Sequence, residues 1–187
     1  MRALYLLIAA GAHDNAWALL DARAIRGSNR VLSEANYAEL KRVASDAAAG
    51  DYFGGSVAAS GDLVAVGAYG DDSNTGSVYI LQVDSSAAAY TQLVKLTASD
   101  AAAYDNFGYS VAIDGSTIVV GAYYKSSGTG AAYVFLTTDG GATYAQVAKL
   151  TAADAASMDY FGISVAIDGN TVVVGAYSVF ATGGALY

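Results

Sequence analysis

The sequence contains no cysteine and no proline, and its single histidine, His13, lies near the start. Without cysteine the chain has no disulfide, no thiolate metal site and no cysteine nucleophile. With one histidine at residue 13, no Ser–His–Asp triad can be built from the rest of the chain. Turns must be formed by the 21 glycines and by Asp, Asn and Ser, which suits tight β-hairpins.

Positive charge is also scarce, because 9 Lys and Arg stand against 17 Asp and Glu. No glutamate follows Glu39, so every acid in residues 41–187 is an aspartate. Asp side chains bond backbone N–H groups in turns, so turn chemistry and solubility explain this acidity. A net charge of −8 makes nucleic acid and anionic membranes poor partners. The 55% of apolar residues are enough for a core.

The first 18 residues have the layout of a secretory signal. Met1-Arg2 precedes an apolar run over residues 3–12, and small residues stand where cleavage would occur. The run is too short to span a bilayer, so we expect a secreted or surface-associated protein without membrane insertion. The alternatives are an ordinary N-terminal helix or a wrongly assigned start. Residues 16–32 have a helical pattern that stops at Gly27, which predicts a helical linker or cap over residues 19–36.

The rest of the chain contains the same sequence pattern three times, with a strict period of 54 residues. Such a period indicates one supersecondary unit repeated. We expect blade units at 45–97 and 99–151 and a truncated unit at 153–187, preceded by a partial unit that begins at residue 37. The residues that keep the period are the pairs Phe53-Gly54, Phe107-Gly108 and Phe161-Gly162, the triplets that begin at Gly67, Gly121 and Gly175, the glycines Gly76, Gly130 and Gly184, the lysines Lys41, Lys95 and Lys149, and the tyrosines Tyr79, Tyr133 and Tyr187.

Each repeat predicts four short strands. In the second copy the predicted strands are Ser110–Ile113, Thr117–Ala122, Ala131–Thr137 and Tyr144–Leu150. Asp114-Gly115 joins the first two, and this pair favours a two-residue hairpin because both positions need φ > 0. Four-stranded antiparallel units with a period near 50 residues are typical of β-propeller blades. The predicted fold is all-β, with about three blades of an incomplete propeller.

The segments 51–58, 63–69 and 76–80 resemble an FG-GAP repeat, the blade unit of the integrin α-subunit propeller. The resemblance covers residues 37–187 in three copies. One departure is tyrosine in place of the family's proline, at Tyr69, Tyr123 and Tyr177. Calcium-binding members carry a D-x-D-x-D-G loop between the first two strands, where this chain has only two-residue turns such as Asp114-Gly115. Such a turn cannot supply the six or more oxygens that calcium needs, so we expect neither a metal nor a cofactor.

One end of the blades is the better candidate for a binding face. The loops after strands two and four meet there, and they carry Tyr and Asp, whereas the other end carries simple turns. Tyrosine is enriched in binding surfaces. The resemblance to integrins implies contact with a partner subunit and ligand on this face. The candidate ligand residues are Tyr69, Asp71, Asp72, Tyr123, Tyr124, Lys125 and Tyr177.

Two further interpretations concern residues near this face. The Phe-Gly pairs of the three copies are expected to be structural, as wedges between blades, with Asp51, Asp105 and Asp159 capping the preceding turns. The loop Gly70–Asn74 differs from its counterparts, which suggests a weak divalent cation site or a contact point. The alternative for this loop is a polar, solvated segment.

The chain is not expected to be an enzyme, because no catalytic set is present. The leading interpretation is a non-catalytic, extracellular adhesion module that binds protein or glycan. The alternative is a structural fragment of a larger FG-GAP adhesion protein, with no activity of its own. Residues 37–44 supply a fourth strand without a blade, and residues 161–187 a blade without a fourth strand. A homodimer could therefore complete a six-bladed propeller.

Overall fold

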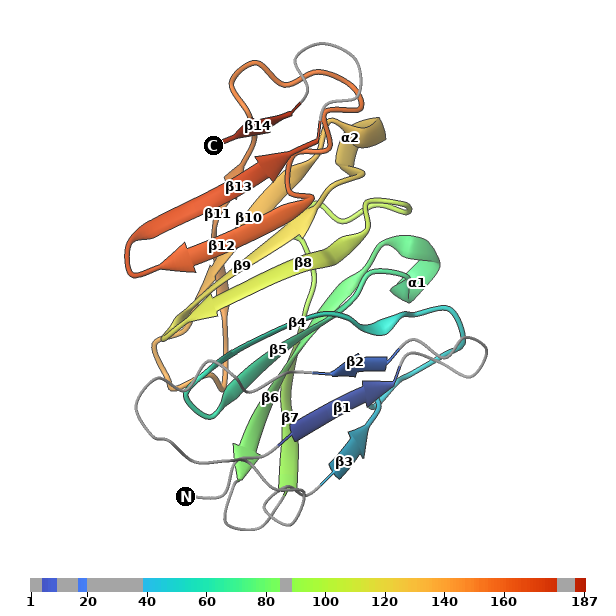
Figure 1. The fold of residues 1–187 in the computed structure, drawn as a ribbon, viewed down its shortest axis with the longest axis vertical. Coiled ribbons are helices and arrows are strands. Elements are labelled where there is room, and N and C mark those ends of the chain that lie inside the picture. Colours follow the sequence, from blue (N-terminus) through green and yellow to red (C-terminus); the bar gives the residue numbers. More distant parts are fainter. Residues whose placement is uncertain (1–4, 10–16, 20–38, 85–88, 178–183) are drawn as a thin grey trace.

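The computed structural model describes residues 5–9, 17–19, 39–84, 89–177 and 184–187. Four sheets follow one another along the molecule, and the short elements α1 and α2 lie on the same side of the stack (Figure 1). The first sheet has the order β2-β1-β3, with β1 (Tyr5–Ala9), β2 (Trp17–Leu19) and β3 (Glu39–Arg42). The other three sheets are antiparallel and correspond to the three repeats.

Each repeat forms one blade, and neighbouring strands in the chain pair with each other. The first blade contains β4 (Phe53–Ser60), β5 (Leu63–Ala68), β6 (Ser77–Asp84) and β7 (Ala89–Leu96). The second contains β8 (Phe107–Asp114), β9 (Thr117–Ala122), β10 (Ala131–Leu136) and β11 (Ala145–Leu150). The third contains β12 (Ser164–Asp168), β13 (Thr171–Ala176) and β14 (Ala185–Leu186). These open sheets confirm the predicted all-β fold of propeller-like blades.

The strands agree closely with the sequence prediction. β9 has the predicted bounds, and β10 and β11 each differ by one residue at one end. β8 begins three residues earlier than predicted, because a bulge between Phe107 and Ser110 lets the strand continue past an irregular pair. Residues Ile118–Ala122 of β9 are all buried, as expected for a middle strand whose two faces are covered by neighbouring blades.

The Phe-Gly pair of each repeat lies where one blade meets the next. The rings of Phe53, Phe107 and Phe161 are buried, with 2%, 0% and 3% of their surface exposed. The glycine that follows each ring has φ between 85° and 92°, a conformation that favours glycine. Thus the structure places the repeat motif in the core of the array.

A second glycine in each repeat allows the blades to approach closely. A Cβ on Gly67 would overlap the carbonyl oxygen of Gly108, and a Cβ on Gly121 would overlap that of Gly162. The same carbonyl groups accept hydrogen bonds from Ser56 Oγ at 2.7 Å and from Ser110 Oγ at 2.8 Å. Backbone contact between blades therefore requires residues without a side chain at these positions.

The N-terminal strands differ from the helix that the sequence predicted there. β2 occupies residues 17–19, so these residues are a strand and not the start of the predicted helix. The rest of that helix lies outside the described residues. β1 pairs with β2 and, in parallel, with β3, and both β1 and β2 lie against β4. The secretory signal over residues 1–18 stays a prediction. No helix in the described ranges has the length and hydrophobicity needed to cross a bilayer.

Substitution of Gly121 by alanine tests the contact between blades. We expect Gly121→Ala to lower the free energy of unfolding by at least about 2 kcal/mol, because the new methyl group must displace the backbone of the third blade. Gly115→Ala is the control, since a Cβ there meets nothing within 4 Å and only its φ of 53° is unfavourable, which costs about 1 kcal/mol. Urea unfolding followed by circular dichroism measures both. Equal stability of the two variants would contradict this packing.

Candidate functional site

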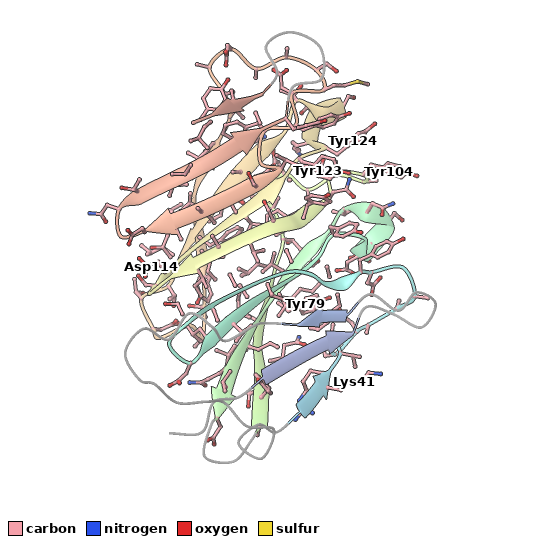
Figure 2. All side chains as sticks on the ribbon, in the orientation of Figure 1. Lys41, Tyr79, Tyr104, Asp114, Tyr123 and Tyr124 are labelled. Atoms are coloured by element: carbon pink, nitrogen blue, oxygen red, sulfur yellow. The ribbon has the colours of Figure 1, made fainter. Side chains whose placement is uncertain are left out.

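Loops from neighbouring elements meet at one end of the blades, which we call the loop end. It carries α1 (Asp71–Asn74), α2 (Lys125–Gly128) and the segments that lead into each first strand. Gly70 N–H donates to Asp51 O at 3.0 Å, and Tyr160 N–H donates to Gly128 O at 2.8 Å. Figure 2 shows Tyr104, Tyr123 and Tyr124 at this end, with Asp114 at the opposite end. The predicted grouping of loops is therefore the observed one.

α1 and α2 have the same backbone although their sequences differ. Each is a single turn that contains left-handed residues, with φ of 48° at Asp72 and 54° at Ser126. A threonine closes each turn, since Thr75 Oγ1 donates to Asp72 O at 2.7 Å and Thr129 Oγ1 donates to Ser126 O at 3.1 Å. The loop 70–74 thus has a structural counterpart, and only its side chains are distinct.

Six tyrosines form a continuous row of ring contacts along the loop end. The row begins with the stacked pair Tyr52 and Tyr69, whose centroids are 4.8 Å apart. It crosses to the second blade through Tyr109, and the rings of Tyr109 and Tyr123 lie 4.4 Å apart. We call this set the tyrosine row: Tyr52, Tyr69, Tyr109, Tyr123, Tyr124 and Tyr160. It links loops of all three blades.

The tyrosine row is ordered by packing and remains accessible. Tyr52 is 43% exposed and Tyr124 is 37% exposed, whereas Tyr69 and Tyr123 are partly buried between neighbours. Burial, together with nearby tyrosines, raises the pKa of Tyr69 and of Tyr123 further above neutral pH, where a tyrosine hydroxyl is already protonated. The row offers rigid ring surface with hydroxyl groups at its edges. Tyr177, another candidate, follows β13 and is 62% exposed.

Beside the row, the aspartate that precedes each blade accepts a hydrogen bond from a tyrosine of that blade, and in the first two blades it also pairs with a lysine of the fourth strand. Tyr79 OH donates to Asp46 at 2.8 Å, and Lys95 Nζ lies 2.7 Å from the same carboxylate. The arrangement recurs with Tyr133 (2.8 Å) and Lys149 (2.6 Å) on Asp100, and with Tyr187 (2.6 Å) on Asp154. The periodic lysines and tyrosines are visible in the sequence, but their shared carboxylate was not predicted, although Asp46, Asp100 and Asp154 keep the same period.

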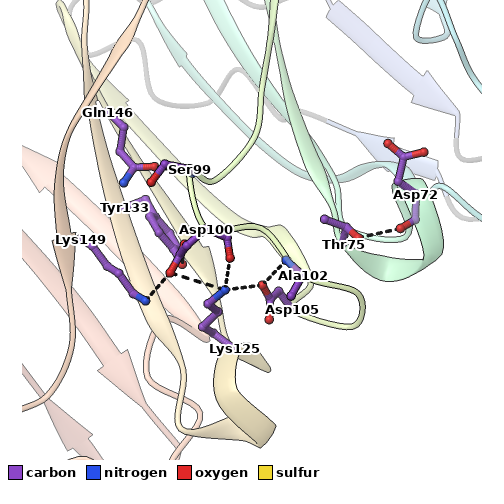
Figure 3. Close-up of polar contacts among 10 residues, drawn as sticks. All are labelled: Asp72, Thr75, Ser99, Asp100, Ala102, Asp105, Lys125, Tyr133, Gln146 and Lys149. Carbon is purple, nitrogen blue, oxygen red and sulfur yellow. Dashed lines mark hydrogen bonds and ion pairs between the residues drawn. The ribbon is translucent and has the colours of Figure 1, made fainter.

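Asp71 and Lys125 occupy equivalent positions in α1 and α2 and carry opposite charges. Asp71 is 5% exposed and pairs with Lys95 at 2.6 Å. Lys125 is 8% exposed; its Nζ lies 2.7 Å from Asp105 Oδ2 and also donates to the backbone oxygen of Asp100 (Figure 3). Both side chains are therefore buried ion-pair members, which corrects the interpretation of a solvated loop for Asp71. Asp72 is the exposed acid of α1.

A hollow opens at the loop end of each complete blade. The first, of about 720 Å³, is lined by four aspartates and Lys95, with Tyr52 at its side. The second, of about 560 Å³, is lined by Tyr104, Asp105, Tyr124 and Lys125. The four aspartates are Asp46, Asp51, Asp71 and Asp72. Across the described ranges, no three histidines or acids are grouped so that they could hold a metal ion.

These features define a class of protein: a propeller-like repeat array with an aromatic face at its loop end. Comparison with protein families matches the FG-GAP repeat to residues 38–81, 90–135 and 144–187. The chain belongs to the FG-GAP repeat family. No curated protein matches it. The Phe-Gly pair and the Gly-Ala pair of the family are the residues that bring the blades into contact here.

The carboxylate of Asp100 predicts a component of stability that depends on pH. Burial alone would raise its pKa, but the hydrogen bonds from Lys149 and Tyr133, with the charges of nearby lysines, outweigh burial and lower the pKa to about 2. Because the pKa of Asp100 is lower in the folded state, its ionised carboxylate stabilises the fold at pH values above 3.8, the usual pKa of an aspartate. This stabilisation is lost as the pH falls toward 2. Since the side chain is 42% exposed, we expect a loss of about 1 kcal/mol.

Urea unfolding at a series of pH values between 5 and 2 measures this component. We expect Asp100→Asn to flatten the profile between about pH 4 and pH 2, while Asp62→Asn, in an exposed hairpin turn, keeps the wild-type slope. Identical profiles for the two variants would show that Asp100 does not contribute as described.

Proposed function

We propose that the chain is a non-catalytic binding module that holds a protein or glycan ligand on the tyrosine row at its loop end. The observation that carries this proposal is the row itself, an ordered and partly exposed set of rings shared by three blades. A function in extracellular adhesion is part of the proposal, and it rests on the family and on the secretory layout of residues 1–18.

The physical chemistry of the row supports binding better than catalysis. Tyrosine has few rotatable bonds, so its large ring surface loses little conformational entropy on binding. The rings are already held by contacts with each other, as at Tyr109 and Tyr123, so a ligand meets a preorganised surface. The hydroxyl groups can donate to the oxygens of a peptide or a sugar. No nucleic acid is proposed, because the chain carries a net charge of −8.

Some of the remaining candidate residues are buried and support the fold, whereas others are exposed and could contact a ligand. The Phe-Gly pairs are buried between blades and cannot reach a ligand. Lys125 and Asp71 are largely enclosed by ion pairs, whereas Asp72 and Tyr177 are exposed at the same end. The alternative proposal is a structural part of a larger FG-GAP adhesion protein, without ligand binding of its own.

Substitution of Tyr124 separates the two proposals. A screen of glycan and extracellular-protein arrays with the full chain first supplies a ligand. We expect Tyr124→Ala to weaken binding of that ligand about tenfold, because an aromatic anchor in a binding surface is worth more than about 1 kcal/mol. Leu136→Ala is the matched control, since Leu136 has the same 37% exposure and lies at the end of β10 away from the loop end. Equal binding by both variants, or no ligand in the screen, would favour the structural alternative.

We also propose a homodimer in which β3 of one copy joins the edge strand β14 of another. In the first two blades a lysine from the fourth strand forms an ion pair with the aspartate that precedes the blade. Asp154 is the equivalent aspartate of the third blade, and among the described residues it accepts a hydrogen bond from Tyr187 but forms no ion pair. Lys41, in β3, lies 54 residues before Lys95 and forms no ion pair within the described ranges. An added strand would place Lys41 on Asp154 by the same geometry.

Light scattering on a sizing column tests this association. We expect a discrete dimer for the wild type, a shift toward monomer for Lys41→Glu and for Asp154→Lys, and recovery of the dimer when both substitutions are combined. A monomeric wild type, or a mass that neither single substitution changes, would rule out the strand exchange.

A further inference from the structure

The first two blades differ by a charge reversal at one position of the same loop. Asp71 in α1 and Lys125 in α2 are 54 residues apart and have the same turn around them. Their neighbours are also equivalent, since Asp46 and Asp51 in the first blade correspond to Asp100 and Asp105 in the second. The second blade therefore shows what the acceptor groups of this loop bind when a cation is present.

In the second blade these acceptors enclose an ammonium group. Lys125 Nζ lies 2.7 Å from Asp105 Oδ2 and 3.6 Å from Asp100 Oδ2, and it donates to the backbone oxygen of Asp100. Asp105 also accepts the N–H of Ala102 at 2.8 Å, which fixes the carboxylate (Figure 3). Two lysines, Lys125 and Lys149, balance the two carboxylates there.

In the first blade the same acceptors lack that cation. Asp51 is held like Asp105, by the N–H of Ala48 at 2.6 Å, and is 8% exposed, but it forms no ion pair among the described residues. Lys95 is engaged by Asp46 at 2.7 Å and by Asp71 at 2.6 Å. Lys95 thus pairs with two of the three carboxylates, and the groups Asp46, Asp51, Asp71 and Lys95 carry a net charge of −2, whereas the equivalent groups of the second blade sum to zero.

We propose that the first hollow receives a lysine or arginine side chain of a protein partner, whose cation takes the place that Lys125 Nζ occupies in the second blade. This inference rests on the proposed function and selects a basic protein ligand over a glycan. An enclosed carboxylate without a counter-charge is costly, so an incoming cation that pairs with Asp51 is favoured. The hollow of about 720 Å³ has room for such a side chain.

The surroundings fit an organic cation better than a metal ion. The described residues contain no cluster that could hold a metal, whereas the second blade already binds an ammonium with the equivalent oxygens. Tyr52, which is 43% exposed, lines the hollow and begins the tyrosine row. It can cover the alkyl part of the incoming side chain. The net charge of −8 would attract a basic partner from a distance.

Exchange of charges between the blades gives a direct test with the full chain. The probe is the peptide acetyl-Gly-Gly-Lys-Gly-Gly-amide, titrated into 15N-labelled protein and followed by NMR shifts of backbone amides. We expect wild-type shifts at Gly50 and Gly70, which line the first hollow. Asp71→Lys supplies an internal ammonium and should weaken binding at least tenfold. Asp62→Lys makes the same charge change in an exposed hairpin turn and should stay within about twofold of the wild type.

The double variant with Asp71→Lys and Lys125→Asp keeps the net charge and should move the site. Its shifts should appear at Tyr104 and Tyr124, which line the second hollow, and vanish at Gly50. Shifts spread over the surface in every variant would show general attraction to an acidic protein and would overturn the proposal. So would a wild type that does not bind, or equal weakening by Asp62→Lys and Asp71→Lys.

A second pair of variants keeps the test decisive if the lysine variants do not fold. Asp51→Asn retains an oxygen for the Ala48 N–H but removes the charge, so it should weaken the peptide at least tenfold. Asp105→Asn makes the same change where Lys125 already fills the site, and it should leave binding unchanged. Equal binding by these two variants would contradict the inference. If Tyr124→Ala still weakens the array ligand, the proposed function stands although this subsite fails.

Discussion

The close backbone approach between consecutive blades is the constraint on which the array depends. Glycine at Gly67 and Gly121 lets the next blade's carbonyl oxygen enter, and Ser56 and Ser110 donate hydrogen bonds to those same oxygens. The phenylalanine before each such carbonyl is then buried. Burial of this ring and satisfaction of the polar backbone occur at one place, so the two requirements support each other. The same contact recurs at both boundaries between consecutive blades.

The contact also holds the loop end, where we propose that a ligand binds. Because the first strand of each blade begins at the contact, the loops just before it are held against the loop that follows the second strand of the preceding blade. For example, Tyr160 N–H, just before the third blade, donates a hydrogen bond to Gly128 O in α2 of the second repeat. A rigid loop end of this kind can carry different side chains on one backbone, as Asp71 and Lys125 show. Scaffold positions keep the period, and under the proposed function ligand specificity would lie where the period breaks.

Much of the fold could be predicted because its signals are local. Hairpin pairs such as Asp114-Gly115 and apolar runs such as Thr117–Ala122 define turns and strands within a few residues, and the period extends them over the array. The N-terminal strands could not be predicted. β1 pairs with β3, which begins 34 residues further along the chain, in parallel, and no local pattern encodes that pairing. A helical pattern around Trp17 was therefore misleading, since a strand partner outweighs local propensity.

The candidate site was predictable in its residue types but not in its connections. Tyrosines at the loop end were expected, yet the part played by Tyr109 and Tyr160 depends on distances between blades. Likewise, the period revealed the lysines, but Lys149 finds Asp100 at a separation of 49 residues. Such pairs form only after the blades are placed, so sequence patterns show the members and not the bonds between them.

Hydrogen exchange tests the central claim, that contacts between blades make the array one cooperative unit. Phe107 N–H donates to Thr75 O at 3.0 Å and Phe161 N–H donates to Thr129 O at 3.2 Å, each across a blade boundary. We expect these two amides to be protected as strongly as the amide of Val120 in a middle strand, with one opening free energy for all three. Fast exchange at Phe107 and Phe161 beside a protected Val120 would show that the blades open independently and that the array is not one cooperative unit.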